Sequence, residues 1–147
     1  MMRFGRTVAT ALAGLALGCG STPRGPVDDA AALEWARITL PPGATDFHYV
    51  GDKGLDFSVE LQFMVPGNAD LSTVYGQVGC VPTADGSKGK REPFGRVMPD
   101  ADWFVESLGP GRTWCTFDAA PINEHRGLRV GPPIEGLRIV QLGVWGH

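Results

Sequence analysis

The sequence alternates most regularly at Leu-Asp-Phe-Ser-Val-Glu-Leu-Gln-Phe-Met-Val, residues 55–65, where every odd-numbered residue is apolar. The even-numbered residues are polar except Met64. Successive side chains of a β-strand point to opposite faces of the sheet, so this pattern predicts a strand with one buried face. Pro66-Gly67 follows directly and ends the predicted strand.

The segments on either side predict a β-hairpin followed by a helix. Residues 45–50 are the expected partner strand, joined to it through the Gly- and Asp-containing turn 51–54. Beyond the hairpin, apolar residues recur at the i, i+3, i+4 and i+7 spacing of one helix face: Leu71, Val74, Tyr75 and Val78. Either Asn68 or Asp70 can cap the start of this helix, and Gly79 can end it.

The rest of the chain predicts further strands separated by loops. Residues 81–99 are rich in Gly, Pro and basic side chains, which is typical of an exposed loop. Residues 99–106 begin Pro-Asp-Ala-Asp, which favours a helix start. A short strand is expected at 112–117 and a closing hairpin within 128–145, where Gly143 is expected to mark a bulge.

Together these elements predict a single α+β domain over residues 38–147, with a small antiparallel sheet, one or two helices packed on one face and one disulfide. Apolar residues make up 43% of the chain and charged residues 20%, which suits a packed core. Residues 28–37 fit either a short helix or a linker.

The first residues have the features of an export signal. Arg3 and Arg6 precede an uncharged run, residues 7–18, which is too short for a transmembrane helix but suits a signal peptide. The junction Leu-Ala-Leu-Gly-Cys, ending at Cys19, resembles the lipobox of bacterial lipoproteins. The resemblance implies that residues 1–18 are removed and that acyl chains such as palmitate anchor Cys19, leaving 19–37 as a tether. The alternative is ordinary secretory cleavage nearby.

Export changes how the other cysteines are interpreted. The chain has three cysteines, so a lipidated Cys19 leaves Cys80 and Cys115 as a pair. Thiols oxidise outside the cytoplasm, and we expect these two to form a structural disulfide worth on the order of 3–4 kcal/mol. Two buried free thiols are the alternative. No Cys-x-x-Cys motif is present, so a redox or zinc role has little support.

A second resemblance involves the entry to the predicted hairpin. Leu-Pro-Pro-Gly-Ala-Thr at residues 40–45 precedes an aromatic strand and the strand end Phe-Met-Val-Pro at 63–66. This arrangement is similar to a group of small bacterial lipoproteins of unknown function. The resemblance implies a hairpin-and-helix fold and no particular activity.

A search for catalytic, metal-binding and cofactor-binding patterns finds none that is convincing. The net charge of −3 lacks the basic footprint that nucleic-acid binding needs. Glu124-His125 is the best residue pair for a loop-built catalytic or metal site, and Asp56 with Glu60 is expected on a solvated strand face. His48 is also expected to face solvent. We therefore predict no catalytic residues, no metal and no cofactor.

The four tryptophans are the remaining candidates for recognition. Trp114 precedes Cys115 and is expected to pack on the disulfide, while Trp145 is expected to end a core strand. Trp35 and Trp103 lie near polar segments, where an exposed indole can contact a partner. These two are the predicted partner-binding residues.

The sequence thus predicts a non-enzymatic lipoprotein of the bacterial cell envelope with a binding or structural role. Its expected partners are the membrane, through the lipid on Cys19, and an envelope protein or glycan. Gly20 stands where Asp often retains lipoproteins in the inner membrane, so outer-membrane delivery stays open. The alternative is a small extracytoplasmic hydrolase or inhibitor whose site is built from residues 81–99 and 119–127.

Overall fold

The computed structural model describes residues 25–86, 91–94, 100–119 and 123–146. The expected signal peptide and Cys19 lie outside the described residues. Along the chain, the elements are α1 (Asp29–Ala36), β1 (Thr45–Lys53), β2 (Phe57–Pro66), α2 (Ser72–Val78), β3 (Thr113–Ala119), β4 (Glu124–Val130) and β5 (Leu137–Gly146).

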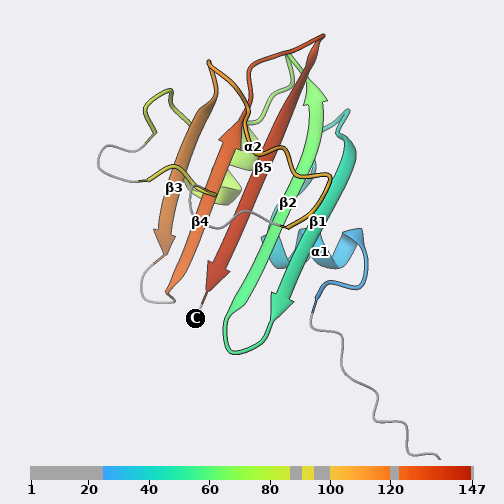
Figure 1. Ribbon diagram of the computed structural model, residues 1–147, viewed down its shortest axis with the longest axis vertical. Coiled ribbons are helices and arrows are strands. Elements are labelled where there is room, and N and C mark those ends of the chain that lie inside the picture. Colours follow the sequence, from blue (N-terminus) through green and yellow to red (C-terminus); the bar gives the residue numbers. More distant parts are fainter. Residues whose placement is uncertain (1–24, 87–90, 95–99, 120–122, 147) are drawn as a thin grey trace, which may run out of the picture.

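The five strands form one antiparallel sheet in the order β1-β2-β5-β4-β3. Figure 1 shows β5 at the centre of this sheet, between the N-terminal hairpin and the β3–β4 hairpin. The predicted α+β class and antiparallel sheet are confirmed, but strands form more of the domain than the small sheet we expected. One reason is that β4 begins at Glu124, before the closing hairpin that we expected within residues 128–145. The polar residues at the start of β4 pair with β3 on one side and with β5 on the other, which lengthens the sheet.

One face of the sheet, here called the helix face, carries the main core. Four apolar residues of the predicted strand are fully buried there, and all four lie on β2: Val59, Leu61, Phe63 and Val65. Each sits opposite β5 in register, and the central pair Leu61–Leu142 is buried on both strands. The period-two pattern therefore predicted the strand and its buried face correctly over most of its length. At its start the prediction is wrong, because Leu55 lies in the turn between β1 and β2 and is fully exposed.

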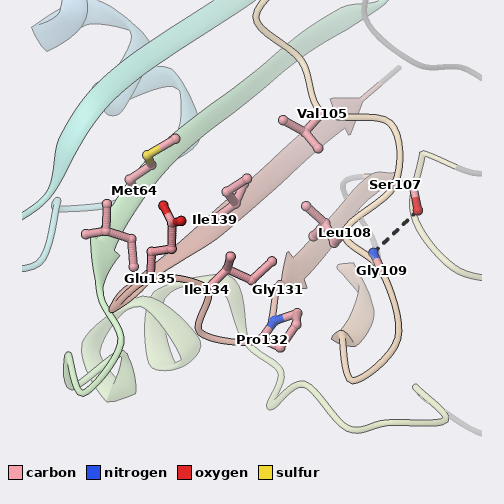
Figure 2. A pocket seen from close by; sticks show the side chains of 11 residues that line it. Met64, Val105, Ser107, Leu108, Gly109, Gly131, Pro132, Ile134, Glu135 and Ile139 are labelled. Atoms are coloured by element: carbon pink, nitrogen blue, oxygen red, sulfur yellow. Dashed lines mark hydrogen bonds between the residues drawn. The ribbon is translucent and has the colours of Figure 1, made fainter.

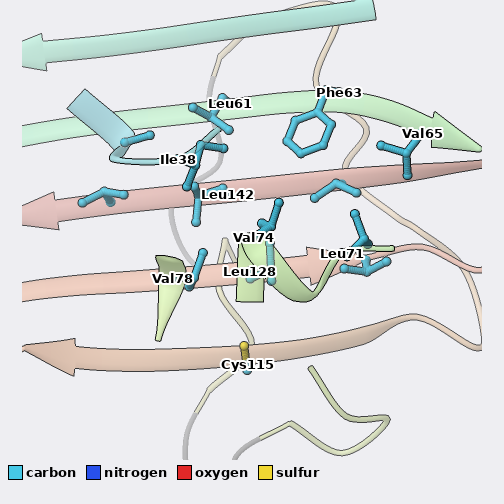
Figure 3. Close-up of a cluster of buried hydrophobic side chains, with 14 of the residues drawn as sticks. Ile38, Leu61, Phe63, Val65, Leu71, Val74, Val78, Cys115, Leu128 and Leu142 are labelled. Carbon is cyan, nitrogen blue, oxygen red and sulfur yellow. The ribbon is translucent and has the colours of Figure 1, made fainter. Parts of the chain in front are cut away.

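Both helices contribute to this core (Figure 3). The Asp28 side chain caps α1 by accepting a hydrogen bond from the Ala31 backbone N–H at 2.8 Å, so the helical interpretation of residues 28–37 is the correct one. In α2, Val74 and Val78 are buried, and Gly79 ends the helix in the left-handed conformation with φ 93°. The predicted amphipathic helix is thus confirmed.

The disulfide between Cys80 and Cys115 is present and joins the end of α2 to β3. Cys115 points into the helix-face core. The expectation that Trp114 packs on this disulfide is wrong, because neighbouring residues of a strand point to opposite faces. The Trp114 indole instead lies over Gly86, where a Cβ atom would meet the ring at 2.3 Å.

The other face of the sheet, here called the second face, is covered by residues 91–94 and 100–112, which we name the crossing segment (Figure 1). The helix expected at 99–106 is absent from the part of the chain that the structure describes. A turn forms there instead, in which the Phe104 N–H bonds to the Ala101 carbonyl at 3.0 Å. The exposed loop expected at 81–99 is also wrong in part, since Phe94 is only 4% exposed.

Gly143 does not mark a bulge, because β5 keeps continuous register with both β2 and β4. Because Gly143 has no side chain, the Trp145 ring can lie directly against its backbone. A Cβ atom at this position would meet the ring at 2.1 Å. Trp145 also contacts Phe94 edge-on, with ring centroids 5.4 Å apart. The glycine therefore makes room for an aromatic ring under the crossing segment.

Candidate functional site: an apolar pocket beside the crossing segment

The crossing segment is fixed to the sheet by a pair of buried amides. Gln62 on β2 and Gln141 on β5 lie opposite each other on the second face and are 2% and 0% exposed. The Gln62 amide donates to the Trp103 carbonyl at 2.8 Å, and its oxygen accepts from the Val105 N–H at 3.0 Å. Gln141 donates to the Gln62 oxygen at 2.8 Å and to the Val105 carbonyl at 2.7 Å. Backbone groups of the segment are thereby satisfied without a sixth strand.

A buried arginine continues this row on β4. Arg129, opposite Gln141, donates to the Glu106 carbonyl at 3.0 Å, and its Nε lies 3.1 Å from a Glu92 carboxylate oxygen. Arg112 binds the same carboxylate through two nitrogens at 2.7 and 2.8 Å. The Arg112 hydrogen bond, together with the charge of Arg129, lowers the pKa of Glu92. The segment is thus held at both Glu92 and Glu106.

Beside this attachment lies a pocket of about 410 Å³ (Figure 2). Its walls come from the end of β2, the crossing segment, the β4–β5 connection and the start of β5. Most of the lining side chains are apolar, the full set being Met64, Val105, Ser107, Leu108, Gly109, Gly131, Pro132, Ile134, Glu135, Leu137 and Ile139. This size and apolar lining are typical of small-molecule sites.

One wall of the pocket is a tight turn that is fixed on both sides. Ile134 and Leu137 exchange backbone hydrogen bonds of 2.8 and 3.0 Å, which leaves Glu135 and Gly136 at the tip. Both tip residues have positive φ, 51° and 79°, as a type I′ turn requires. The Gly67 N–H also donates to the Gly136 carbonyl at 2.7 Å, so the turn is tied to the chain after β2.

The predicted partner-binding tryptophans do not lie in this pocket, nor do they share a surface. Trp103 stacks on His48 with ring centroids 5.4 Å apart, on the second face. His48 was expected to face solvent, and its side chain is 37% exposed although Trp103 covers one side of the ring. Trp35 packs against Phe57 and the helix-face core, with the Lys53 ammonium 5.8 Å from its ring centroid. The structure therefore places the two indoles on opposite sides of the sheet.

The residues suggested for a loop-built catalytic site are also separated. Glu124 is 9% exposed and is ion-paired with Arg126 at 2.7 Å and with Arg37, on the helix face. His125, the next residue on β4, points to the other face and lies 2.7 Å from Asp118. A carboxylate and an imidazole on opposite faces of one strand cannot act on the same substrate atom.

Glu60 was expected on a solvated strand face but is half-buried. Its carboxylate accepts a hydrogen bond from the Trp145 indole N–H at 2.6 Å. Burial raises the pKa of the Glu60 carboxyl, and the bond from Trp145 opposes that rise. Glu60 is therefore the hydrogen-bond acceptor for the indole of Trp145, whose ring lies against Gly143.

Within the described ranges, no three or more His, Cys, Asp or Glu side chains gather closely enough to hold a metal ion. None of the helices in this part of the chain is both long enough and apolar enough to cross a membrane. Comparisons with protein-family models, curated proteins and solved structures give no match.

Proposed function

We propose that this protein is a non-enzymatic lipoprotein of the bacterial cell envelope that binds an apolar ligand in the pocket beside the crossing segment. The observation that carries the binding role is the pocket itself, whose lining contains one carboxylate and one hydroxyl among apolar side chains. No nucleophile–base pair is present among those lining residues.

The disulfide supports export and an anchor at Cys19. Disulfides persist in oxidising compartments, and the bond between Cys80 and Cys115 uses two of the three cysteines. Cys19 is then the one cysteine left for another chemistry, at the end of the lipobox-like segment. In this proposal, the lipid holds the domain at the membrane and the pocket supplies its specific contact.

Intact mass of protein extracted from native membranes tests the anchor. We expect loss of residues 1–18, an added mass of diacylglyceryl size or larger on Cys19, and alkylation of Cys80 and Cys115 only after reduction. The control is a Cys19→Ser chain, which should carry no lipid mass. An unprocessed chain with three reactive thiols would overturn both the export and the anchoring parts of the proposal.

Filling the pocket tests the binding role. Ile139 lies on the second face of β5, opposite Met64, and both line the pocket. Ile139→Trp extends an indole into this space, so we expect the affinity for the neutral fluorescent probe N-phenyl-1-naphthylamine to fall by about tenfold or more, which is roughly 1.4 kcal/mol. Probe fluorescence is measured by titration of the Cys19→Ser chain, which cannot receive the lipid.

The matched control for this titration is Val50→Trp. Val50 is 41% exposed on β1, does not line the pocket, and accepts an added indole at the surface. We expect its affinity for the probe to equal that of the Cys19→Ser parent. Equal affinity in the Ile139→Trp chain, or specific turnover of an envelope substrate by the parent, would contradict the proposed function.

A further inference from the structure

We infer that the ligand of this pocket is an amphiphilic cation, with an apolar chain or ring inside the pocket and an ammonium group paired with Glu135. This inference rests on the proposed function and gives the chemical class of its ligand. It draws on the shape of the pocket, the charges around it and the backbone conformation of Glu135.

The pocket separates an apolar interior from a charged rim. Met64, Leu108 and Ile139 supply apolar side chains to its walls. Glu135 is exposed at the tip of the turn, and its side chain points toward Met64 and Ile139 (Figure 2). A bound molecule that fills the apolar space therefore ends beside a carboxylate.

The Glu135 carboxylate at the rim of the pocket forms no ion pair in the described part of the chain. Among the described residues, the exposed Glu106, which lies between two lining residues, forms none either. Arg112 and Arg129 both contact Glu92, so these two guanidinium groups share one carboxylate. The exposed carboxylate of Glu135, which lines the pocket without an ion pair, therefore complements a positive ligand group.

Arg138 is the basic residue next to the lining residues of β5, and its side chain is directed away from the pocket. It lies between Leu137 and Ile139 on β5, so its side chain points to the helix face. There it is close enough to Tyr75 on α2 to affect the pKa of that phenol, which burial raises. The helix-face position leaves Glu135 without a basic partner.

Glu135 is an unusual residue for the turn position that it occupies. The first tip position of a type I′ turn has positive φ and strongly favours Asn, Asp or Gly. Glu135 occupies this position with φ 51°, although a longer side chain gains nothing for the turn. Arg37, Asp46, Phe94 and Asn123 also have positive φ, but Glu135 is the one of these five residues that lines the pocket.

Displacement of N-phenyl-1-naphthylamine by three eight-carbon amphiphiles tests the charge preference. Octylammonium and octanoate are titrated against the Cys19→Ser chain below their critical micelle concentrations, and octanol is titrated below its solubility limit. We expect octylammonium to displace the probe at about fivefold lower concentration than octanoate, because an exposed carboxylate attracts one headgroup and repels the other. Octanol should fall between them, and added salt should reduce the difference.

Two substitutions of Glu135 and one control locate the effect. Glu135→Gln keeps the size of the side chain, and we expect the preference for octylammonium over octanoate to fall below about twofold. Glu135→Asn should lower it equally while raising the thermal midpoint, since Asn suits the turn. Glu34→Gln removes an exposed carboxylate on α1, on the far side of the sheet, and should leave the preference unchanged.

The outcomes separate this inference from the proposed function. If the probe does not bind, or binds equally to the Ile139→Trp chain, the binding function itself is wrong. If the probe binds in the pocket but octanoate displaces it as well as octylammonium does, the pocket binds apolar molecules and the inferred cationic class is wrong. An undiminished preference in Glu135→Gln also overturns the assignment to Glu135.

Discussion

Replacing both Cys80 and Cys115 with alanine is expected to lower the free energy of unfolding by about 3–4 kcal/mol. The disulfide joins residues separated by 35 positions, and the crossing segment lies within the loop that it closes. Without this bond, the unfolded chain gains conformational freedom, and the segment must be ordered on the second face by its own contacts. Urea denaturation followed by tryptophan fluorescence and by circular dichroism measures the loss.

The same protein under reducing conditions provides the control for this variant. Reduced wild-type chain and the double-alanine chain should unfold at the same urea concentration, because both lack the cross-link. The Cys19→Ser chain should keep the midpoint of the oxidised protein. If the double-alanine chain unfolds at the wild-type midpoint, the disulfide does not contribute to stability and our account of the loop is wrong.

Gln62→Leu is expected to destabilise the domain by about 3 kcal/mol. The substitution removes the partner of the Trp103 carbonyl and the Val105 N–H, and takes from Gln141 one of its two acceptors. Each buried group left without a partner raises the free energy of the folded state, and leucine cannot replace the bonds. Equilibrium unfolding in urea measures the change.

Gln77→Leu is the matched control, because Gln77 makes the same kinds of contact in an exposed place. Its oxygen accepts from the Thr39 N–H at 2.9 Å and its nitrogen donates to the Thr39 hydroxyl at 3.3 Å, both accessible to water. Water can replace these bonds, so we expect a loss below about 1 kcal/mol. Similar losses in the two variants would show that burial of the Gln62 amide does not determine its contribution.

The helix-face core was predictable because local periodicity encodes it. The alternation on β2 and the helical spacing of Val74 and Val78 each specify a buried face within a few consecutive residues. The disulfide was predictable for a different reason. If one of the three cysteines is lipidated in an exported chain, the other two are left to pair in an oxidising compartment. These features need little knowledge of which distant segments meet.

The second face was not predictable in this way. Phe94, Phe104 and Leu108 are buried, but they are scattered through Gly- and Pro-rich sequence with no strand or helix period. Gln62 follows the polar half of the strand pattern, which correctly placed it on the second face but wrongly suggested solvent. Gln62 is buried because the crossing segment packs over it, and the strand pattern carries no information about this contact.

The pocket escaped prediction because its walls come from segments far apart in the sequence. Met64, Leu108 and Glu135 belong to three such segments, and none has a neighbour in sequence that marks a binding site. The recognisable signal was the Glu-Gly dipeptide between two apolar residues at 134–137. In hindsight, Glu at a position that favours Asn or Asp in a tight turn is unusual enough to be noticed.

The central place of β5 has a consequence for the order of events in biosynthesis. β5 is the last of the described strands to be made, yet it is the strand that joins β2 to β4. Until residues 137–146 have emerged from the ribosome, the nascent chain holds two hairpins with no shared sheet, and isolated hairpins are barely stable in water. Formation of the five-stranded sheet is therefore postponed until this last described strand has been made.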